Sequence, residues 1–367
     1  MATYIVRRVV QGLIVLVLST FVIYSILILT PGGPLDQVAA FREDRTNKIN
    51  EQYVLALLDA YNLNEPYPIN YLLWLFDPED IWEVDPHDQL VRKGINVDIF
   101  GWHIEGSGAL TGDFGRSLQV QKGRPVMELM GERLGPTLSL TATSLIIAIL
   151  LALAIGIVSA IRQYSRLDYT ITGLSFVGTS MPAFWFGLML VIFLAVLPKQ
   201  LSMHPGWEWV PYFPPTNSYD LDQQNNIINR IYHLVLPVTV LVIGNTAGFS
   251  RYVRSSMLEV LKQDYVRTAQ AKGLAERSVI MKHAFRNALI PVITQITLSL
   301  PFLFSGAIAT ETIFAYPGMG QLFIKAIFTL DFPLVMAFLL IVTLIIIFSN
   351  ILADILYGVA DPRIRFS

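Results

Sequence analysis

Residues Val9–Leu29 read VVQGLIVLVLSTFVIYSILIL, a run of 21 residues without a charged side chain. An α-helix rises 1.5 Å per residue, so this run would span about 31 Å, close to the roughly 30 Å hydrocarbon core of a bilayer. Arg7 and Arg8 precede it, and Thr30-Pro31-Gly32-Gly33-Pro34 follows it. The run is longer than the apolar part of a secretory signal, which has roughly 7–15 residues, and no small-x-small cleavage site follows it. We therefore interpret it as a retained first membrane-spanning helix.

Five further apolar runs of similar length predict five more spans. They cover approximately Thr137–Ile161, Tyr169–Val196, His233–Ser250, Ala288–Ile313 and Pro333–Tyr357. Of the 367 residues, 53% are hydrophobic and only 15% are charged, against about a quarter charged in soluble domains. The sequence therefore predicts an all-α membrane protein with six transmembrane helices.

The distribution of lysine and arginine predicts the orientation of these helices. If the N-terminus is cytoplasmic, 14 Lys and Arg lie in the 59 inside residues, which are 1–8, 162–168, 251–287 and 361–367. The 159 outside residues, which are 31–135, 198–232 and 314–332, hold 12. Basic residues concentrate on the cytoplasmic side of membrane proteins. We therefore expect both termini in the cytoplasm and a long extracytoplasmic loop between the first two helices.

The expected domain organisation follows from these spans. Residues 1–30 hold the N-terminus and the first helix, 31–135 the outer loop, 136–360 the core with the other five helices, and 361–367 a cytoplasmic tail. The outer loop contains the apolar cluster Tyr71–Phe76 and an acidic stretch, 77–112, of unknown role. A second outer loop carries Trp207 and Trp209, which could anchor at the membrane interface or receive a partner.

The sequence lacks the motifs that are typical of several kinds of catalytic and binding site. The chain has no cysteine, so disulfides and thiolate sites are excluded, and its net charge of −2 gives no indication of nucleic-acid binding. The dipeptide Gly-Lys is absent, so there is no Walker A loop to cradle nucleotide phosphates. The five histidines form no His-Glu-x-x-His motif, and no Gly-x-Ser-x-Gly elbow occurs. We expect a non-catalytic protein that binds no metal or cofactor of its own.

The segment 251–287 is the longest expected cytoplasmic loop, with eight basic and three acidic residues. The helical spacing of Leu258, Leu261, Tyr265 and Ala269 predicts that these side chains share one face. Lys272 and Gly273 form a helix stop, a cation in the last turn followed by a residue that tolerates positive φ. Glu276 would then lie in the first turn of a second amphipathic helix, which runs towards Asn287 and Pro291.

A loop that only fixes the orientation of the membrane helices does not need two short helices joined at a glycine. A few basic residues suffice for that purpose. We therefore interpret 251–287 as a docking element for a cytoplasmic partner.

The same segment carries a resemblance to a known family. Asp264-Tyr-Val-Arg-Thr-Ala-Gln-Ala-Lys-Gly-Leu274, followed by His283-Ala-Phe-Arg-Asn-Ala-Leu-Ile-Pro291, resembles the cytoplasmic coupling loop of ABC-importer permeases, and in particular the first permease subunit of dipeptide and oligopeptide importers. Other family-like blocks occur in the same order along nearly the whole chain: Arg7-Arg8, Gly112–Ser117, Arg133–Thr137, Ser180–Trp185, Arg254–Glu259, Glu311–Gly320 and Leu356–Arg363.

The resemblance departs from the general importer pattern at two places. Of the pattern Glu-Ala-Ala-x-x-x-Gly, only Ala269 and Gly273 match, with Arg267 and Thr268 in the first two positions, a variant usual in the peptide branch. The first helix is followed by Pro31-Gly32-Gly33-Pro34 where relatives often have Pro-Gly-Asp-Pro. Besides these two motifs, the acidic stretch 77–112 is longer than is typical of the family, which concerns the shape of the outer face and leaves the class unchanged.

The resemblance implies a fold, a function and partners. The fold would be that of a type I ABC-importer permease, one half of a heterodimeric pore in the cytoplasmic membrane that takes up peptides by alternating access. Expected partners are a homologous second permease, one or two kinds of ATPase subunit that use ATP and Mg²⁺, an extracytoplasmic peptide-binding protein, and membrane lipid. The ATPase-coupling residues would be Asp264, Tyr265, Arg267, Ala269, Gly273 and Leu274. The resemblance implies no substrate-binding residues.

Two alternatives stay open. Permeases of the same class carry nickel, glutathione or oligosaccharides. A proton-coupled secondary transporter would need ionisable residues at membrane depth, for which the candidates are Glu311 and Asp354. Both acids are predicted near interfaces, where water would reach them.

Overall fold

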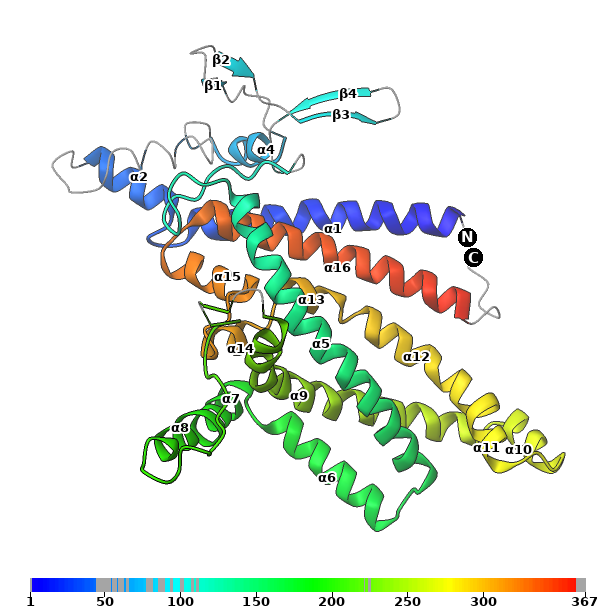
Figure 1. The fold of residues 1–367 in the computed structure, drawn as a ribbon. Coiled ribbons are helices and arrows are strands. Elements are labelled where there is room, and N and C mark those ends of the chain that lie inside the picture. The colour runs from blue at the N-terminus through cyan, green and yellow to red at the C-terminus, as the bar shows by residue number, and fades with distance from the viewer. Residues whose placement is uncertain are drawn as a thin grey trace. The chain divides into compact units, whose positions relative to one another are not determined.

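The computed structural model describes residues 2–43, 54, 58, 63, 66–76, 82–84, 90–92, 95–99, 102–106, 109, 112–220, 222–223 and 226–360 (Figure 1). The chain forms two compact units. Unit 1 contains Met1–Val9, Arg133–Gln321 and Ile345–Ser367, and unit 2 contains Val10–Glu132 and Leu322–Leu344. The predicted tail, 361–367, and half of the acidic stretch 77–112 lie outside the described residues.

Six helical segments in the described part of the chain are long and apolar enough to cross a membrane, which confirms the predicted number. They are Val6–Asp36, Val126–Ile161, Ala183–Ser202, Ile227–Leu261, Glu276–Ile313 and Phe332–Gly358. Several spans begin earlier than predicted, because helices continue beyond the apolar run into polar sequence. The second, for example, begins at Val126 and takes ten residues from the predicted outer loop.

The helices of the first part of the chain are α1 (Ala2–Leu29), α2 (Pro34–Glu43), α4 (Ile69–Phe76), α5 (Val126–Ile161), α6 (Arg166–Ser180), α7 (Ala183–Val191), the π-helical η2 (Ile192–Val196) and α8 (Leu197–Ser202). Those of the second part are α9 (Ile227–Leu261), α10 (Asp264–Ala271), α11 (Glu276–Ser278), the π-helical η3 (Val279–Phe285), α12 (Arg286–Thr297), α13 (Leu300–Ser305), α14 (Ile308–Ile313), α15 (Met319–Phe328) and α16 (Phe332–Ala360).

Two short antiparallel hairpins were not predicted. Strand β1 (Trp82–Val84) pairs with β2 (Leu90–Arg92), and β3 (Ile95–Ile99) pairs with β4 (Trp102–Gly106). In the second hairpin Ile95 lies opposite Gly106 and Ile99 opposite Trp102. The membrane core of the fold is nevertheless all-α, as predicted.

The predicted third span, Tyr169–Val196, is wrong as a single helix. Helix α6 ends at Ser180, Met181 is extended (φ −77°, ψ 121°), and α7 begins at Ala183. Pro182 causes this break, because its ring disfavours helical backbone at the preceding residue. The span formed by the described residues runs instead from Ala183 to Ser202.

The predicted fifth span, Ala288–Ile313, is interrupted twice. Helix α12 ends at Thr297, and α13 occupies only Leu300–Ser305, with Pro301 in its first turn. Gly306 has φ +78°, a left-handed conformation that ends α13, and α14 begins at Ile308. A single apolar run in the sequence therefore folds as three helices in series.

The predicted loop 251–287 is also shorter than expected. Helix α9 continues without a break to Leu261, so 251–261 extend a membrane-spanning helix beyond its apolar part. Pro237 lies within α9 and does not end it. Only 262–275, which include the short helix α10, separate α9 from the next span.

Two apolar clusters organise unit 1. One joins α5, α7 and α9 to α14 through buried residues such as Leu140, Leu236 and Phe314. The other joins the far ends of α5 and α9 to α10, η3 and α12; its buried members are Ala160, Val253, Met257, Val266, Ala269, Val279, Ala284, Ala288 and Val292. The second cluster is the base on which α10 rests, and we call it the α10 base.

Candidate functional site

The predicted coupling residues gather on the corner formed by α10 and the start of α11, drawn in yellow in Figure 1. Asp264 begins α10, where its negative charge favours the helix N-terminus. Val266 and Ala269 are buried in the α10 base. Because these two side chains are three residues apart, they lie on one face of the helix and fix the opposite face outward.

The outward face of α10 carries the other predicted residues. Tyr265 is 40% exposed and Leu274 is 44% exposed. Arg267 and Asp264 are almost free of neighbours and form only a 3.7 Å ion pair. An exposed pair of this kind contributes little to stability. The face is therefore free to contact another molecule.

Gly273 makes the corner. Its φ is +74°, and its N–H donates to the carbonyl of Gln270 at 2.9 Å, after the Lys272 N–H donates to Thr268. The chain then turns, and Glu276 begins α11, which continues through η3 into α12. These observations confirm the predicted helix stop at Lys272 and Gly273 and the second helix beginning at Glu276.

One prediction about this segment is wrong. Leu258 and Leu261 do not share a helical face with Tyr265 and Ala269, because α9 ends at Leu261 and α10 begins at Asp264. Gln263, extended at φ −73° and ψ 148°, separates the two helices. The residue that packs beside Ala269 is Val266, whereas Tyr265 points outward.

A buried ion pair supports the neighbouring part of unit 1. Asp168, in the first turn of α6, is 2% exposed and accepts from Arg254 of α9 at 2.7 Å (Nε) and 2.8 Å (Nη2). It also accepts from the Ser159 hydroxyl and from the Tyr164 N–H. The Arg254 guanidinium holds the pKa of the Asp168 carboxyl well below its usual range, so the carboxylate is charged. This pair joins α9 to the α5–α6 connection.

Glu311 is not near water as predicted, because its side chain is fully buried. Its carboxylate accepts from the Thr137 hydroxyl and from the Gln321 N–H, both at 3.0 Å. Thr137 in turn accepts from the Met319 N–H at 2.7 Å. Glu311 therefore fastens the segment 306–321 to α5. Asp354, by contrast, is 31% exposed and lies 3.0 Å from Arg8.

A second buried carboxylate lies in unit 2. Asp331, just before α16, is fully buried and accepts from the Ser117 hydroxyl at 2.5 Å. It also accepts from three successive backbone N–H groups, those of Leu118, Gln119 and Val120, at 2.8–3.2 Å. We call this arrangement the Asp331 clasp. It fixes the segment before α5 to the start of α16.

The sequence did not indicate Asp168 or Asp331 as structural residues. Each is a single acid next to an apolar run. Arg254, the charged partner of Asp168, is 86 residues away in the chain, and the partners of Asp331 are more than 200 residues away. The blocks that contain the partners, Gly112–Ser117 and Arg254–Glu259, were noticed only through the resemblance.

Six helical segments long and apolar enough to cross a membrane describe a multi-pass membrane protein, and in unit 1 the corner of α10 and α11 packs against α5, α9 and α12. Residues 152–366 match the model of the family described as binding-protein-dependent transport system inner membrane component. The chain belongs to this family and is a transport permease subunit.

Curated relatives extend over the whole chain. It is 37% identical over 366 residues to the oligopeptide transport system permease protein AppB of Bacillus subtilis, with all of both chains covered. It is 35% identical over 381 residues to the dipeptide transport system permease protein DppB of Alkalihalophilus pseudofirmus, covering all of both chains. The dipeptide permease DppB of Escherichia coli K12 is 39% identical over 267 residues, 70% of this chain and 78% of the relative.

Proposed function

We propose that this chain is the transmembrane permease subunit of an ATP-binding-cassette importer for dipeptides or oligopeptides, and that the corner of α10 and α11 receives an ATPase subunit. The observation that carries the proposal is the corner itself. Val266 and Ala269 are buried in the α10 base and attach α10 to it, while Asp264, Tyr265, Arg267 and Leu274 face outward. The family membership and the names of the full-length relatives support the substrate class.

The proposed mechanism follows from this packing. The α10 base includes residues of α5, α9 and α12, so a force on α10 is passed to three helices of the core. Closure of the ATPase subunits on ATP would shift the corner as a rigid body and change the accessibility of the pore from one side to the other. In this scheme the partner subunits bind ATP and Mg²⁺, and this chain converts the movement of those subunits into a change in the accessibility of the pore.

The partners and orientation belong to the same proposal. A homologous permease would complete the pore, one or two kinds of ATPase would bind on the cytoplasmic side, and an extracytoplasmic binding protein would deliver the peptide. Both termini would be cytoplasmic, as the basic residues predict. The remaining function candidates differ in cargo (nickel, glutathione or oligosaccharide) or in energy source (a proton gradient).

Uptake by membrane vesicles tests this function. Vesicles with the chain and its companion subunits should accumulate a labelled dipeptide when ATP is supplied, and a protonophore should not reduce the initial rate. Excess unlabelled peptide should compete, whereas nickel, glutathione and oligosaccharide should not. Uptake that collapses with the proton gradient would contradict the energy source, and competition by nickel or glutathione alone would contradict the cargo. The purified chain without companions should hydrolyse no ATP.

A further inference from the structure

The short helix α4 and the turn before it lie against the first membrane span. The Tyr71 hydroxyl donates to the Val17 carbonyl at 3.0 Å and lies 2.9 Å from the Thr20 hydroxyl. The Tyr67 hydroxyl lies 2.9 Å from that of Ser25. All of these α1 partners belong to the uncharged run that forms the span, and all lie in unit 2.

These contacts measure the depth of α4. At 1.5 Å per residue, Ser25 is about 6 Å and Val17 about 18 Å along the helix from Leu29, where the run ends. The hydrocarbon core of a bilayer is about 30 Å thick. Tyr67 and Tyr71 therefore contact α1 from about 6 Å to about 18 Å from the Leu29 end, which reaches just past the middle of the span, at a level occupied by lipid chains.

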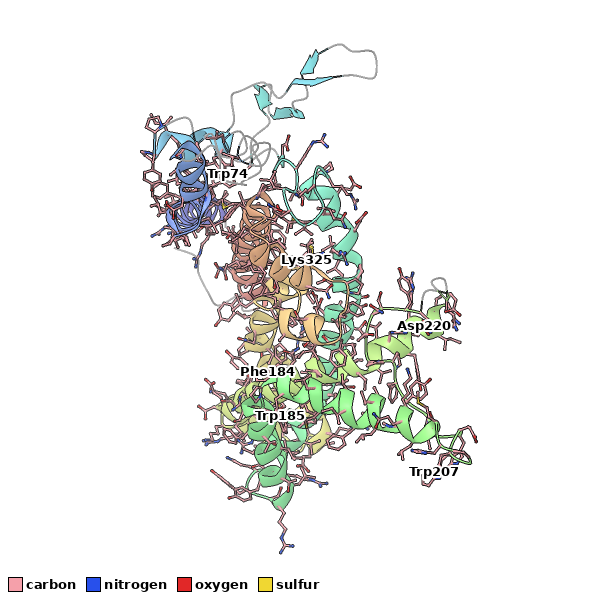
Figure 2. All side chains as sticks on the ribbon, turned by 90° about the vertical axis from the view of Figure 1, so that its left-hand side faces the viewer. Trp74, Phe184, Trp185, Trp207, Asp220 and Lys325 are labelled. Atoms are coloured by element: carbon pink, nitrogen blue, oxygen red, sulfur yellow. The ribbon has the colours of Figure 1, made fainter. Side chains whose placement is uncertain are left out.

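Aromatic packing fixes α4 at that level. Tyr24 is fully buried, and its ring centroid lies 5.5 Å from the rings of both Tyr71 and Trp74. Phe21 makes an edge contact with Tyr71 at 5.2 Å. Figure 2 shows Trp74 beside the blue helix α1. Four rings joined in this way hold α4 in place.

The backbone at the start of α4 is adapted to a site without water. The first N–H groups of a helix normally lack partners within the helix. Here the Ile69 and Asn70 N–H groups donate to the Pro66 carbonyl at 2.8 and 3.4 Å, and the Tyr71 N–H donates to the Pro68 carbonyl at 3.1 Å. The two prolines have no N–H of their own, so few donors at this end are left to be hydrated.

The outer face of α4 is apolar and unpartnered in the described structure. Ile69 is 48% and Leu72 51% exposed. On α1 the side chains of Leu18, Val22 and Ile26, at the same level, are 59%, 52% and 60% exposed. The exposed surface of α4 thus has the same apolar character as the exposed surface of the span that carries it.

We infer that α4 is embedded in the membrane leaflet adjoining Leu29, where Ile69 and Leu72 contact lipid acyl chains. The partner of this surface is lipid, because its depth is set by contacts to a membrane span. The inference refines the expectation that all of 31–135 lies in the extracytoplasmic solvent. It depends on α1 being a span and is independent of what the protein transports.

Site-directed spin labelling tests this placement in the full chain in lipid vesicles. The sequence has no cysteine, so single nitroxides can be attached to Leu72→Cys and, as a second site, Ile69→Cys. Leu18→Cys on α1 is the lipid control, and the exposed Lys122→Cys is the water control. Collision rates with apolar oxygen and with a water-soluble nickel chelate are measured for each label.

Labels on α4 should resemble the Leu18 label, with a severalfold higher ratio of oxygen to nickel-chelate collisions than the Lys122 label. A ratio like that of Lys122 would place α4 in water and overturn the inference. Low collision rates with both reagents would show that a protein covers this surface, which would equally overturn it. A Leu18 label that itself behaved as hydrated would overturn the span on which the inference depends.

Discussion

Glycines at which an added Cβ would overlap with neighbouring atoms give the sharpest predictions at the scale of single residues. Gly318 lies against the buried Glu311 carboxylate, and a Cβ at Gly318 would overlap with both carboxylate oxygens. Gly306 and Gly320 approach the same carboxylate. The glycines of this segment are therefore required because the chain passes so close to the buried carboxyl group of Glu311.

Gly318→Ala should destabilise the protein by about 1–3 kcal/mol, the usual cost of overpacking. Gly244→Ala, in the middle of α9 with open space around its Cβ position, should be neutral or slightly stabilising, since alanine favours helix. Thermal unfolding of the two variants in the same detergent measures the difference. Equal melting temperatures for Gly318→Ala and wild type would contradict the packing around Glu311.

Asp168→Asn should destabilise unit 1 by about 1.5–3 kcal/mol, because the partly buried Arg254 would lose a charged acceptor. The pKa of Asp168 is lowered in the folded state, so the pair stabilises fully above the unfolded pKa of about 3.9 and is lost only as pH falls through the lowered value. The difference between variant and wild type should therefore be constant from pH 5 to 8. A difference that shrinks within that range would contradict a permanently charged pair.

At the scale of elements, the Asp331 clasp connects two segments that the sequence separates by more than 200 residues. Asp331→Asn would place an NH₂ group against at least one of the N–H donors in either orientation of the amide, whereas Ser117→Ala would remove a single donor. We expect Asp331→Asn to increase protease cleavage within 112–125 severalfold, and Ser117→Ala to increase it less. Equal resistance of Asp331→Asn and wild type would show that the clasp does not hold this segment.

The helices also show which parts of the fold could be predicted from the sequence. Apolar runs predicted six spans, and Lys272-Gly273 predicted the corner, because span length and helix stops are local properties. The breaks at Pro182 and Gly306 and the end of α9 at Leu261 were not predicted. A proline inside an apolar run can end a helix, as Pro182 does, or lie within it, as Pro237 lies within α9. Only tertiary packing decides between these outcomes.

The coupling residues show the same limit. Their grouping on one corner could be predicted from sequence, but not which of them are buried. Val266 rather than Tyr265 is buried in the α10 base. The extended residue Gln263 separates α10 from α9, so the buried face of α10 does not continue that of α9. Asp168, Arg254 and Asp331 could not be paired, since nothing local identifies partners that are distant in the chain.

At the scale of the whole molecule, the orientation can be tested with single cysteines. Glu208→Cys probes the segment 203–226, and Ala275→Cys probes the corner; both positions are exposed. In intact cells an impermeant thiol reagent should label Glu208→Cys and not Ala275→Cys. In inverted vesicles the pattern should reverse. Labelling of Ala275→Cys in intact cells would contradict the proposed cytoplasmic corner.

The central proposal is that the corner at Gly273 couples ATP hydrolysis to transport. Gly273 has φ +74°, which costs a residue with a Cβ roughly 1–2 kcal/mol, and no side chain lies near enough to clash with a new Cβ. Gly273→Val should therefore alter the angle of the corner without disturbing the core. Gly206→Val is the matched control, because Gly206 has φ +85°, open surroundings and a position outside the corner.

The decisive measurement is ATP-driven uptake of a labelled dipeptide by vesicles that contain either variant with its companion subunits, at equal amounts of permease. We predict that Gly273→Val loses most of its uptake, with the ATPase subunits either released or hydrolysing ATP without transport, while Gly206→Val retains uptake close to wild type. Wild-type uptake by Gly273→Val would contradict the coupling role of the corner.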